Sequence, residues 1–235
     1  LYSMFNKHPK GLIAAALANL GERFGFYTMM AILVLFLQAK FGMNGKEAGF
    51  IYSTFYFSIY ILALVGGIIA DKTRNYKGTI FTGIVLMAVG YLLLAIPSKT
   101  PVDNKMLYLV ITCASLFVIA FGNGLFKGNL QALVGQMYDN PQYANMRDSG
   151  FSLFYMFINI GAIFAPFAAV GVRNWWLSTF GYNYDADLPA LCHGQLAGTL
   201  SPEATETYHT LVTKASTPPV QDYTAFASDY LNVFT

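Results

Sequence analysis

The chain has 235 residues, of which 55% are hydrophobic, 16% aromatic and only 11% charged. A typical soluble domain carries about 25% charged residues, so this composition excludes an ordinary soluble globular protein and favours a membrane protein. The net charge of +2 is too small for a nucleic-acid-binding protein, which presents a clear basic patch. Two cysteines give neither a disulfide framework nor a metal site.

Five apolar stretches reach, or nearly reach, the length of about 20 residues that a helix needs to cross a bilayer. They cover residues 11–37, 50–70, 79–96, 106–134 and 149–172. The connections between them are short, which favours antiparallel packing of neighbouring helices. The sequence therefore predicts an all-α integral membrane fold, with residues 1–172 forming a transmembrane bundle.

Residues 173–235 have a different character, because they are polar and contain several prolines and acidic residues. We expect a water-exposed, extracytoplasmic insertion with short helices at about residues 202–214 and 222–234. It would lead into a sixth helix that this sequence does not contain, so the sequence is interpreted as part of a longer protein. Six Lys and Arg residues on one side of the spans against five on the other favour a cytoplasmic N-terminus.

Only three charged residues, Glu22, Arg23 and Lys127, fall well inside the predicted spans. A charge at the bilayer centre costs roughly 3 kcal/mol or more, so such residues usually face a cavity and belong to a transport pathway. The alternative is a buried ion pair that only holds helices together. Two cations against one anion disfavour that alternative, because a surplus positive charge suits an anionic ligand group.

A polar face on the first span carries the strongest local signal. Asn19, Arg23 and Tyr27 are spaced by four residues and Asn19 and Glu22 by three, so they share one helix face. Arg23 can present its guanidinium fork to a carboxylate, and Glu22 can neutralise Arg23 or take up a proton.

Four segments resemble motifs of the proton-dependent oligopeptide transporters, which belong to the major facilitator superfamily. The run from Asn19 to Tyr27 is similar to the family's Glu-x-x-Glu-Arg-Phe-x-Tyr-Tyr motif, and residues 66–72 are similar to the superfamily's loop motif after helix two. Residues 122–129 resemble Gly-x-Gly-x-x-Lys-Pro-Asn, and residues 151–162 resemble Phe-x-x-Phe-Tyr-x-x-x-Asn-x-Gly. The resemblance covers about residues 8–170 and implies the N-terminal half of a twelve-helix transporter in the plasma (inner) membrane.

The resemblance also implies roles for individual residues. Family members import di- and tripeptides with protons, and Arg23 and Lys127 match residues that recognise the substrate carboxylate and couple to protons. Glu22 matches an acid that takes part in coupling. Residues that would line the peptide site complete the list: Tyr27, Tyr60, Asn159 and Tyr155.

Four positions depart from the family pattern. Asn19 replaces the first Glu of the motif and removes one possible proton carrier, while Phe26 replaces the first Tyr of the closing pair. Met30 stands where many members carry another substrate-facing Arg, and Gly128 stands in place of Pro. The proton stoichiometry and the number of cations in the carboxylate pocket are therefore open.

Asp71, Lys72 and Arg74, with Lys77, lie in a predicted short loop after the second span. Basic residues there fit an orientation signal, since cytoplasmic loops are rich in Lys and Arg. The resemblance favours a second interpretation, a conformational latch formed by Asp71, Lys72 and Arg74. Composition does not separate the two.

Gly122, Gly124 and Lys127 have the spacing of a phosphate-binding loop but lack its strand–loop–helix setting, so close helix packing is the better interpretation. No catalytic set, metal site or cofactor motif is visible, and an enzyme is not expected. The expected partners are di- and tripeptides, protons, the lipid bilayer and the C-terminal bundle of the same protein, with no nucleic acid. A carrier for another small anion, such as nitrate or an amino-acid conjugate, and a non-transporting receptor remain as alternatives.

Overall fold

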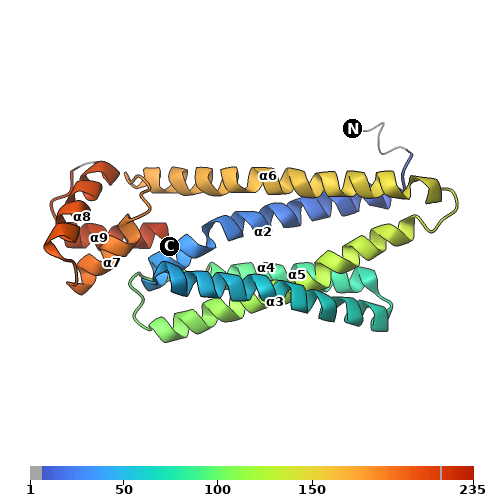
Figure 1. Cartoon of the computed structure of the whole chain (residues 1–235), viewed down its shortest axis with the longest axis horizontal. Helices are drawn as coiled ribbons and strands as arrows, with labels where there is room; N and C mark the ends of the chain where they lie inside the picture. The colour runs from blue at the N-terminus through green and yellow to red at the C-terminus, as the bar shows by residue number, and fades with distance from the viewer. Residues whose placement is uncertain (1–6, 218) are drawn as a thin grey trace. The chain divides into compact units, whose positions relative to one another are not determined.

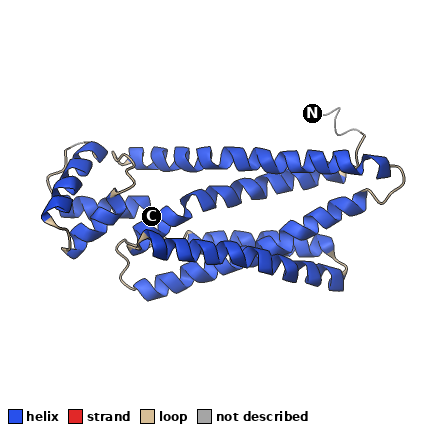
Figure 2. Ribbon diagram, viewed as in Figure 1, coloured by secondary structure: helices blue, strands red, loops and turns tan. Residues whose placement is uncertain are grey.

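Long helices dominate residues 7–217 and 219–235, which the computed structural model describes (Figure 1). These residues form no strand beyond one isolated bridge between Tyr182 and Ser216 (Figure 2). The predicted all-α class is confirmed. The helices, with a short 3-10 turn at Ala144–Met146, are α2 (Gly11–Phe41), α3 (Gly45–Thr73), α4 (Tyr76–Leu94), α5 (Lys105–Met137), α6 (Arg147–Thr179), α7 (Leu188–Ala197), α8 (Pro202–Ala215) and α9 (Tyr223–Phe234).

Five of these described helices, α2 to α6, are long and apolar enough to cross a membrane. Four of them extend past the predicted apolar stretches, because their end turns are polar and a hydropathy count stops before them. The fifth, α4, begins before the predicted stretch of residues 79–96, at Tyr76, and also ends before the end of that stretch, at Leu94. The largest extension is in α6, which continues to Thr179 through the start of the segment predicted to be polar insertion. The boundary between residues 172 and 173 stays a prediction.

By spatial contacts the chain falls into two compact units. The first comprises the described residues up to Met29, Ser53–Ala95 and Ile111–Pro166; the second comprises Met30–Tyr52, Ile96–Val110 and Phe167–Thr235. Each is described by itself below.

Glycines hold the helices of the first unit close together. A Cβ added to Gly124 of α5 would lie 2.5 Å from the Leu62 carbonyl oxygen of α3, and one added to Gly122 would lie 2.6 Å from the Gly83 carbonyl oxygen of α4. Because lipid tails are as apolar as the side chains, helices in a membrane associate through such close packing rather than through hydrophobic burial. The interpretation of Gly122 and Gly124 as packing residues is confirmed.

The second unit contains a small helical subdomain made of α7, α8 and α9 (orange to red in Figure 1). The helices predicted near residues 202–214 and 222–234 are confirmed as α8 and α9, whereas α7 was not predicted. Ser201 and Asp222 cap α8 and α9 by accepting hydrogen bonds from the first free backbone N–H groups. The buried core of the unit is made by Ala39, Leu177, Leu188, Cys192, Tyr208, Val212, Ala215, Phe226, Ala227, Tyr230 and Leu231.

Hydrogen bonds join this subdomain to the end of α2 and to the α4–α5 connection of the same unit. His193 of α7 bonds through Nε2 to the Ala39 carbonyl over 2.6 Å. The Thr100 amide in the α4–α5 connection donates to Asn232 Oδ1 over 2.6 Å. The polar segment is therefore folded, and hydrogen bonds attach it to the end of α2 and to the α4–α5 connection within the same unit.

Candidate functional site

A buried ion pair lies in the middle of α2. The Arg23 guanidinium donates to both oxygens of the Glu22 carboxylate, through Nε to Oε2 and through Nη2 to Oε1, the latter over 2.6 Å. Asn123 of α5 donates a third hydrogen bond from Nδ2 to Glu22 Oε1, also over 2.6 Å. The carboxylate is thus held by a cation of its own helix and by a neutral amide of a neighbouring helix.

Aromatic rings surround the cation of this pair. Arg23 is 4% exposed, and its Cζ lies 4.9 Å from the Phe26 ring centroid and 5.8 Å from the Tyr27 ring centroid. Ring faces attract a guanidinium, most strongly where water is excluded. Phe26, one of the departures from the family pattern, therefore contacts Arg23 through its ring, although it lacks the hydroxyl of the Tyr it replaces.

Lys127 lies one turn beyond Asn123 on α5. Its Nζ is 5.5 Å from the centroid of the Tyr60 ring of α3, and the Tyr60 hydroxyl donates to the Tyr56 hydroxyl over 3.1 Å. Within the described residues the ion pairs are Arg23–Glu22 and Arg147–Asp139, so Lys127 has no carboxylate partner there. The structure thus brings Lys127 and Tyr60 together and leaves one intramembrane cation uncompensated.

Asn159 and Tyr155 lie on α6, one turn apart and exposed on the chain. The Tyr155 ring contacts Phe151 and Phe154 of its own helix. In the part of the chain that the structure describes, neither residue makes a hydrogen bond with the other candidate residues. Their assignment to the substrate site stays a prediction.

Asn19 and Met30 lie on either side of the ion pair on α2, and they are 4% and 8% exposed. Gly128 of α5 has open space around it, since an added Cβ would meet nothing within 4 Å. The departures at positions 19 and 30 are therefore buried on the same helix as the ion pair.

The proposed latch residues do not all lie in a loop, which corrects the prediction. Asp71 and Lys72 belong to the last turn of α3 and Lys77 to the first turn of α4, which leaves Arg74, with φ +51°, and one further residue between the helices. Asp71 accepts a hydrogen bond from the Tyr76 hydroxyl over 2.5 Å. The predicted loop began too early because Asp71 and Lys72 are charged, and a span identified by hydropathy ends before charged residues even where the helix continues.

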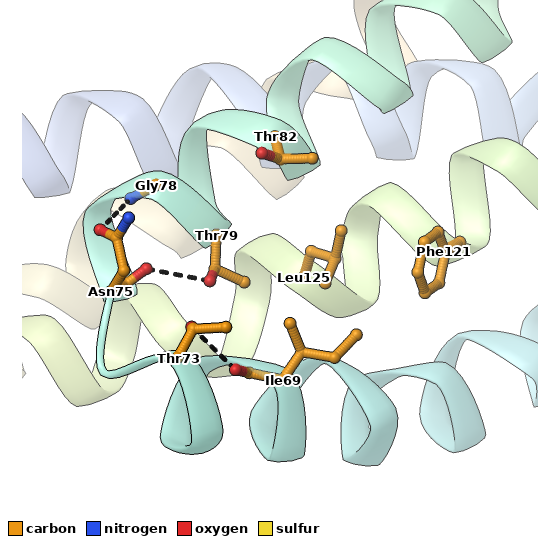
Figure 3. Close-up of a pocket in the computed structure, with 8 residues that line it drawn as sticks. All are labelled: Ile69, Thr73, Asn75, Gly78, Thr79, Thr82, Phe121 and Leu125. Atoms are coloured by element: carbon orange, nitrogen blue, oxygen red, sulfur yellow. Dashed lines mark hydrogen bonds between the residues drawn. The ribbon is translucent and has the colours of Figure 1, made fainter.

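A pocket of about 400 Å³ opens beside this connection (Figure 3). Asn75 fixes its rim, because its side chain accepts from the Gly78 amide and its carbonyl accepts from the Thr79 hydroxyl. The remaining lining residues are Ile69, Thr73, Thr82, Phe121 and Leu125. The pocket is mainly apolar and holds no charged side chain.

Sequence reasoning missed Asn123 and Tyr91. Asn123 is fully buried and contacts Glu22, while the Tyr91 hydroxyl of α4 is buried without a hydrogen-bond partner among the described residues. The spacing of four residues between Asn123 and Lys127 puts both on one helix face and could have identified Asn123.

The fold and the buried charges define a multi-pass membrane protein with polar groups inside its helical bundle. A model of the POT family (PTR2) matches residues 77–192. The peptide transporter YePEPT of Yersinia enterocolitica is 34% identical over 185 residues, covering 77% of this chain and 34% of that protein. Dipeptide and tripeptide permease A of Enterobacter sp. (strain 638) is 34% identical over 179 residues, covering 75% of this chain and 32% of that protein.

Solved structures agree with these relatives. A peptide transporter POT in complex with sulfate matches with a TM-score of 0.63 and 28% identity, over 89% of this chain and 44% of that chain. Tetrameric PepTSo2 matches with a TM-score of 0.63 and 25% identity, over 95% of this chain and 48% of that chain. The chain belongs to the POT family, which confirms the predicted membership, and it spans about a third of the length of the curated relatives cited above.

Proposed function

We propose that this chain forms the N-terminal half of a transporter that imports di- and tripeptides together with protons. The observation that carries the proposal is the uncompensated Lys127 beside Tyr60, on the same helix as the amide that holds the Glu22–Arg23 pair. The relatives named peptide transporter and dipeptide and tripeptide permease support the choice of substrate. On this view the chain is a carrier and not an enzyme.

The substrate site uses fixed charges to replace the hydration of a zwitterionic peptide. Moving such a peptide through lipid is costly, and secondary transporters meet that cost near the midplane with charges and dipoles between their two halves. Lys127 would bind the peptide carboxylate, with Arg23 joining it once released from Glu22. Tyr27, Tyr60, Tyr155 and Asn159 would complete the wall of the site.

Proton coupling follows from the Glu22–Arg23 pair. When Glu22 takes up a proton it loses its charge, and its attraction to Arg23 falls. Arg23 then becomes available to a substrate carboxylate, so binding of the proton and of the peptide favour each other. Alternating access would follow from rocking of this bundle against the C-terminal bundle of the same protein.

The orientation and the latch complete the proposal. A cytoplasmic N-terminus in the plasma (inner) membrane would place the Asp71–Arg74 segment in the cytoplasm and the α7–α9 subdomain outside. Asp71, Lys72 and Arg74 would then act as a latch between conformations, with the Tyr76–Asp71 hydrogen bond as one of its contacts.

Uptake of labelled dialanine by the full-length protein in liposomes, with and without an inward proton gradient, tests the function. Gradient-dependent uptake that other dipeptides compete away is the expected result. Uptake that ignores the gradient would contradict proton coupling. If the protein takes up no dipeptide but does take up nitrate or an amino-acid conjugate, the proposed substrate class is wrong and the protein is a carrier for another small anion.

A further inference from the structure

Asn123 is fully buried, yet half of its amide has no partner. Its Nδ2 donates to Glu22 Oε1 over 2.6 Å, and its Oδ1 accepts no hydrogen bond from the residues that the structure describes. A buried polar atom without a partner is destabilising, so its position calls for a physical explanation.

The chemistry of the neighbouring acid supplies that explanation. An ionised carboxylate only accepts hydrogen bonds, whereas a protonated carboxyl group also donates one. A primary amide offers two donors and one acceptor, so it matches either form. Asn123 therefore carries both groups that Glu22 needs. Its Nδ2 donor already bonds to the carboxylate, and its Oδ1 acceptor, which suits the O–H of a protonated carboxyl group, has no partner among the described residues.

We propose that Asn123 is the positioning residue that holds Glu22 in both of its protonation states. In the ionised state Nδ2 donates to Glu22 Oε1. When a proton binds to the carboxylate, the amide rotates about its last side-chain bond and Oδ1 accepts the new O–H. The proton stays on Glu22 until it leaves to water on the other side, and the first hydrogen bond then re-forms. This inference rests on the proposed proton-coupled function.

The surroundings of Glu22 favour Asn123 for this role. The Arg23 guanidinium can only donate hydrogen bonds, so it cannot accept one from a protonated carboxyl group. On α6, the residue that packs against α2 here is Gly161, and a glycine has no side chain that could accept one. The Tyr91 hydroxyl of α4, like Asn123 Oδ1, is buried without a hydrogen-bond partner among the described residues. Of these two residues, however, Asn123 is the one that already donates a hydrogen bond to the Glu22 carboxylate. Among the titratable and charged residues on the helices around Glu22 are Arg23 and Tyr27 on α2, Tyr60 on α3, Tyr91 on α4, Lys127 on α5 and Tyr155 on α6.

The same helix offers a matched control. Asn129 is 2% exposed, and its Nδ2 donates to the Gly66 carbonyl over 3.0 Å and to the Leu125 carbonyl over 2.8 Å. Both partners are backbone groups that do not titrate. Asn129→Leu therefore removes buried hydrogen bonds of an asparagine without touching an acid.

The test measures dialanine uptake into liposomes as a function of external pH, together with counterflow exchange, which needs no proton gradient. Asn123→Leu should raise the pH of half-maximal uptake by about one unit, because hydrogen bonds to charged groups contribute more than neutral ones and the ionised form loses more. Counterflow should persist. Asn129→Leu should lower the amount of folded protein and leave the midpoint unchanged.

Asn123→Asp is the second variant, because it has the same shape and fills the same space. Two carboxyl groups in contact share one proton, so its midpoint should rise further than that of Asn123→Leu. Midpoints equal to wild type in both variants would overturn the inference. So would a shift in Tyr91→Phe with none in Asn123→Leu, since Tyr91 would then be the acceptor.

A second readout separates this inference from the proposed function. The infrared carboxyl band that disappears in Glu22→Gln reports protonation of Glu22 in the purified full-length protein, without transport. If wild type shows no gradient-driven uptake, proton coupling fails, yet a shift of this band in Asn123→Leu still supports the role of Asn123. If wild-type uptake needs the gradient and the band does not move, only the inference fails.

Discussion

The ammonium group of Lys127 lies 5.5 Å from the centre of the Tyr60 ring and has no carboxylate partner among the described residues. The cation is thus held by an aromatic face on the neighbouring helix α3, an interaction weaker than an ion pair. A side chain held in this way remains available to an anionic ligand group.

Replacing Lys127 by Ala should raise the KM for dialanine by about 10- to 100-fold, the value of a charge-assisted hydrogen bond of about 1.5–3 kcal/mol. Lys127→Arg should bring the KM part of the way back to the wild-type value, because arginine keeps the positive charge but carries it on a planar guanidinium instead of a compact ammonium group. Lys46→Ala removes an exposed lysine from the first turn of α3 and serves as the control. An unchanged KM in Lys127→Ala would refute the assignment of Lys127 to the carboxylate.

Glu22→Gln should abolish gradient-driven uptake while dialanine counterflow continues. The amide keeps the size of the side chain but cannot take up a proton, so uptake and the gradient are no longer linked. Glu47→Gln is the matched control, since Glu47 lies in the first turn of α3 and accepts only from the Asn44 amide among its described contacts. Fully proton-driven uptake by Glu22→Gln would show that the coupling acid lies elsewhere.

Gly124→Ala should lower the thermal stability of the full-length protein in detergent, whereas Gly128→Ala should not. The new methyl group at position 124 would lie 2.5 Å from the Leu62 carbonyl oxygen, while the one at position 128 would meet nothing within 4 Å. Overpacking of this kind costs about 1–3 kcal/mol, and Ala in an open helix position is favourable. Equal melting temperatures for the two variants would contradict the close contact of α3 and α5.

The α7–α9 subdomain should loosen in mild acid through His193. Burial lowers the pKa of His193 below its usual value of 6.5, and the charge of Lys105 adds to this, while the bond to the Ala39 carbonyl opposes it. The unfolded segment therefore binds more protons, so the stability is fully present above pH 6.5 and is lost as the pH falls from there through the folded pKa.

Hydrogen exchange of α7, compared at about pH 7.5 and about pH 5.5, measures this effect. His193→Gln keeps a side-chain donor that does not titrate, so its α7 should exchange without that dependence. His209→Gln is the control, because the His209 ring stacks on the Tyr223 ring with 3.9 Å between their centroids and does not bond to α2. Equal pH dependence in wild type and His193→Gln would exclude His193 as the sensor.

The sequence by itself determined the membrane class, the five long helices and the helices α8 and α9. These features follow from hydropathy and capping residues that act within one segment, and they can be recognised without knowing what the segment packs against. The three intramembrane charges could be identified for the same reason, since a charge in an apolar run is visible locally.

Only the tertiary structure decided which of those charges are paired. Glu22 binds Arg23 and Asn123, Lys127 faces Tyr60, and Asn159 makes no hydrogen bond with either group among the described residues. The true ends of α3 and α6 and the existence of α7 were also beyond the sequence, because charged end turns and a short helix are stabilised by contacts with other segments. Such contacts depend on how helices cross, and the crossing is set by glycine packing between α3, α4 and α5, which a single sequence does not reveal.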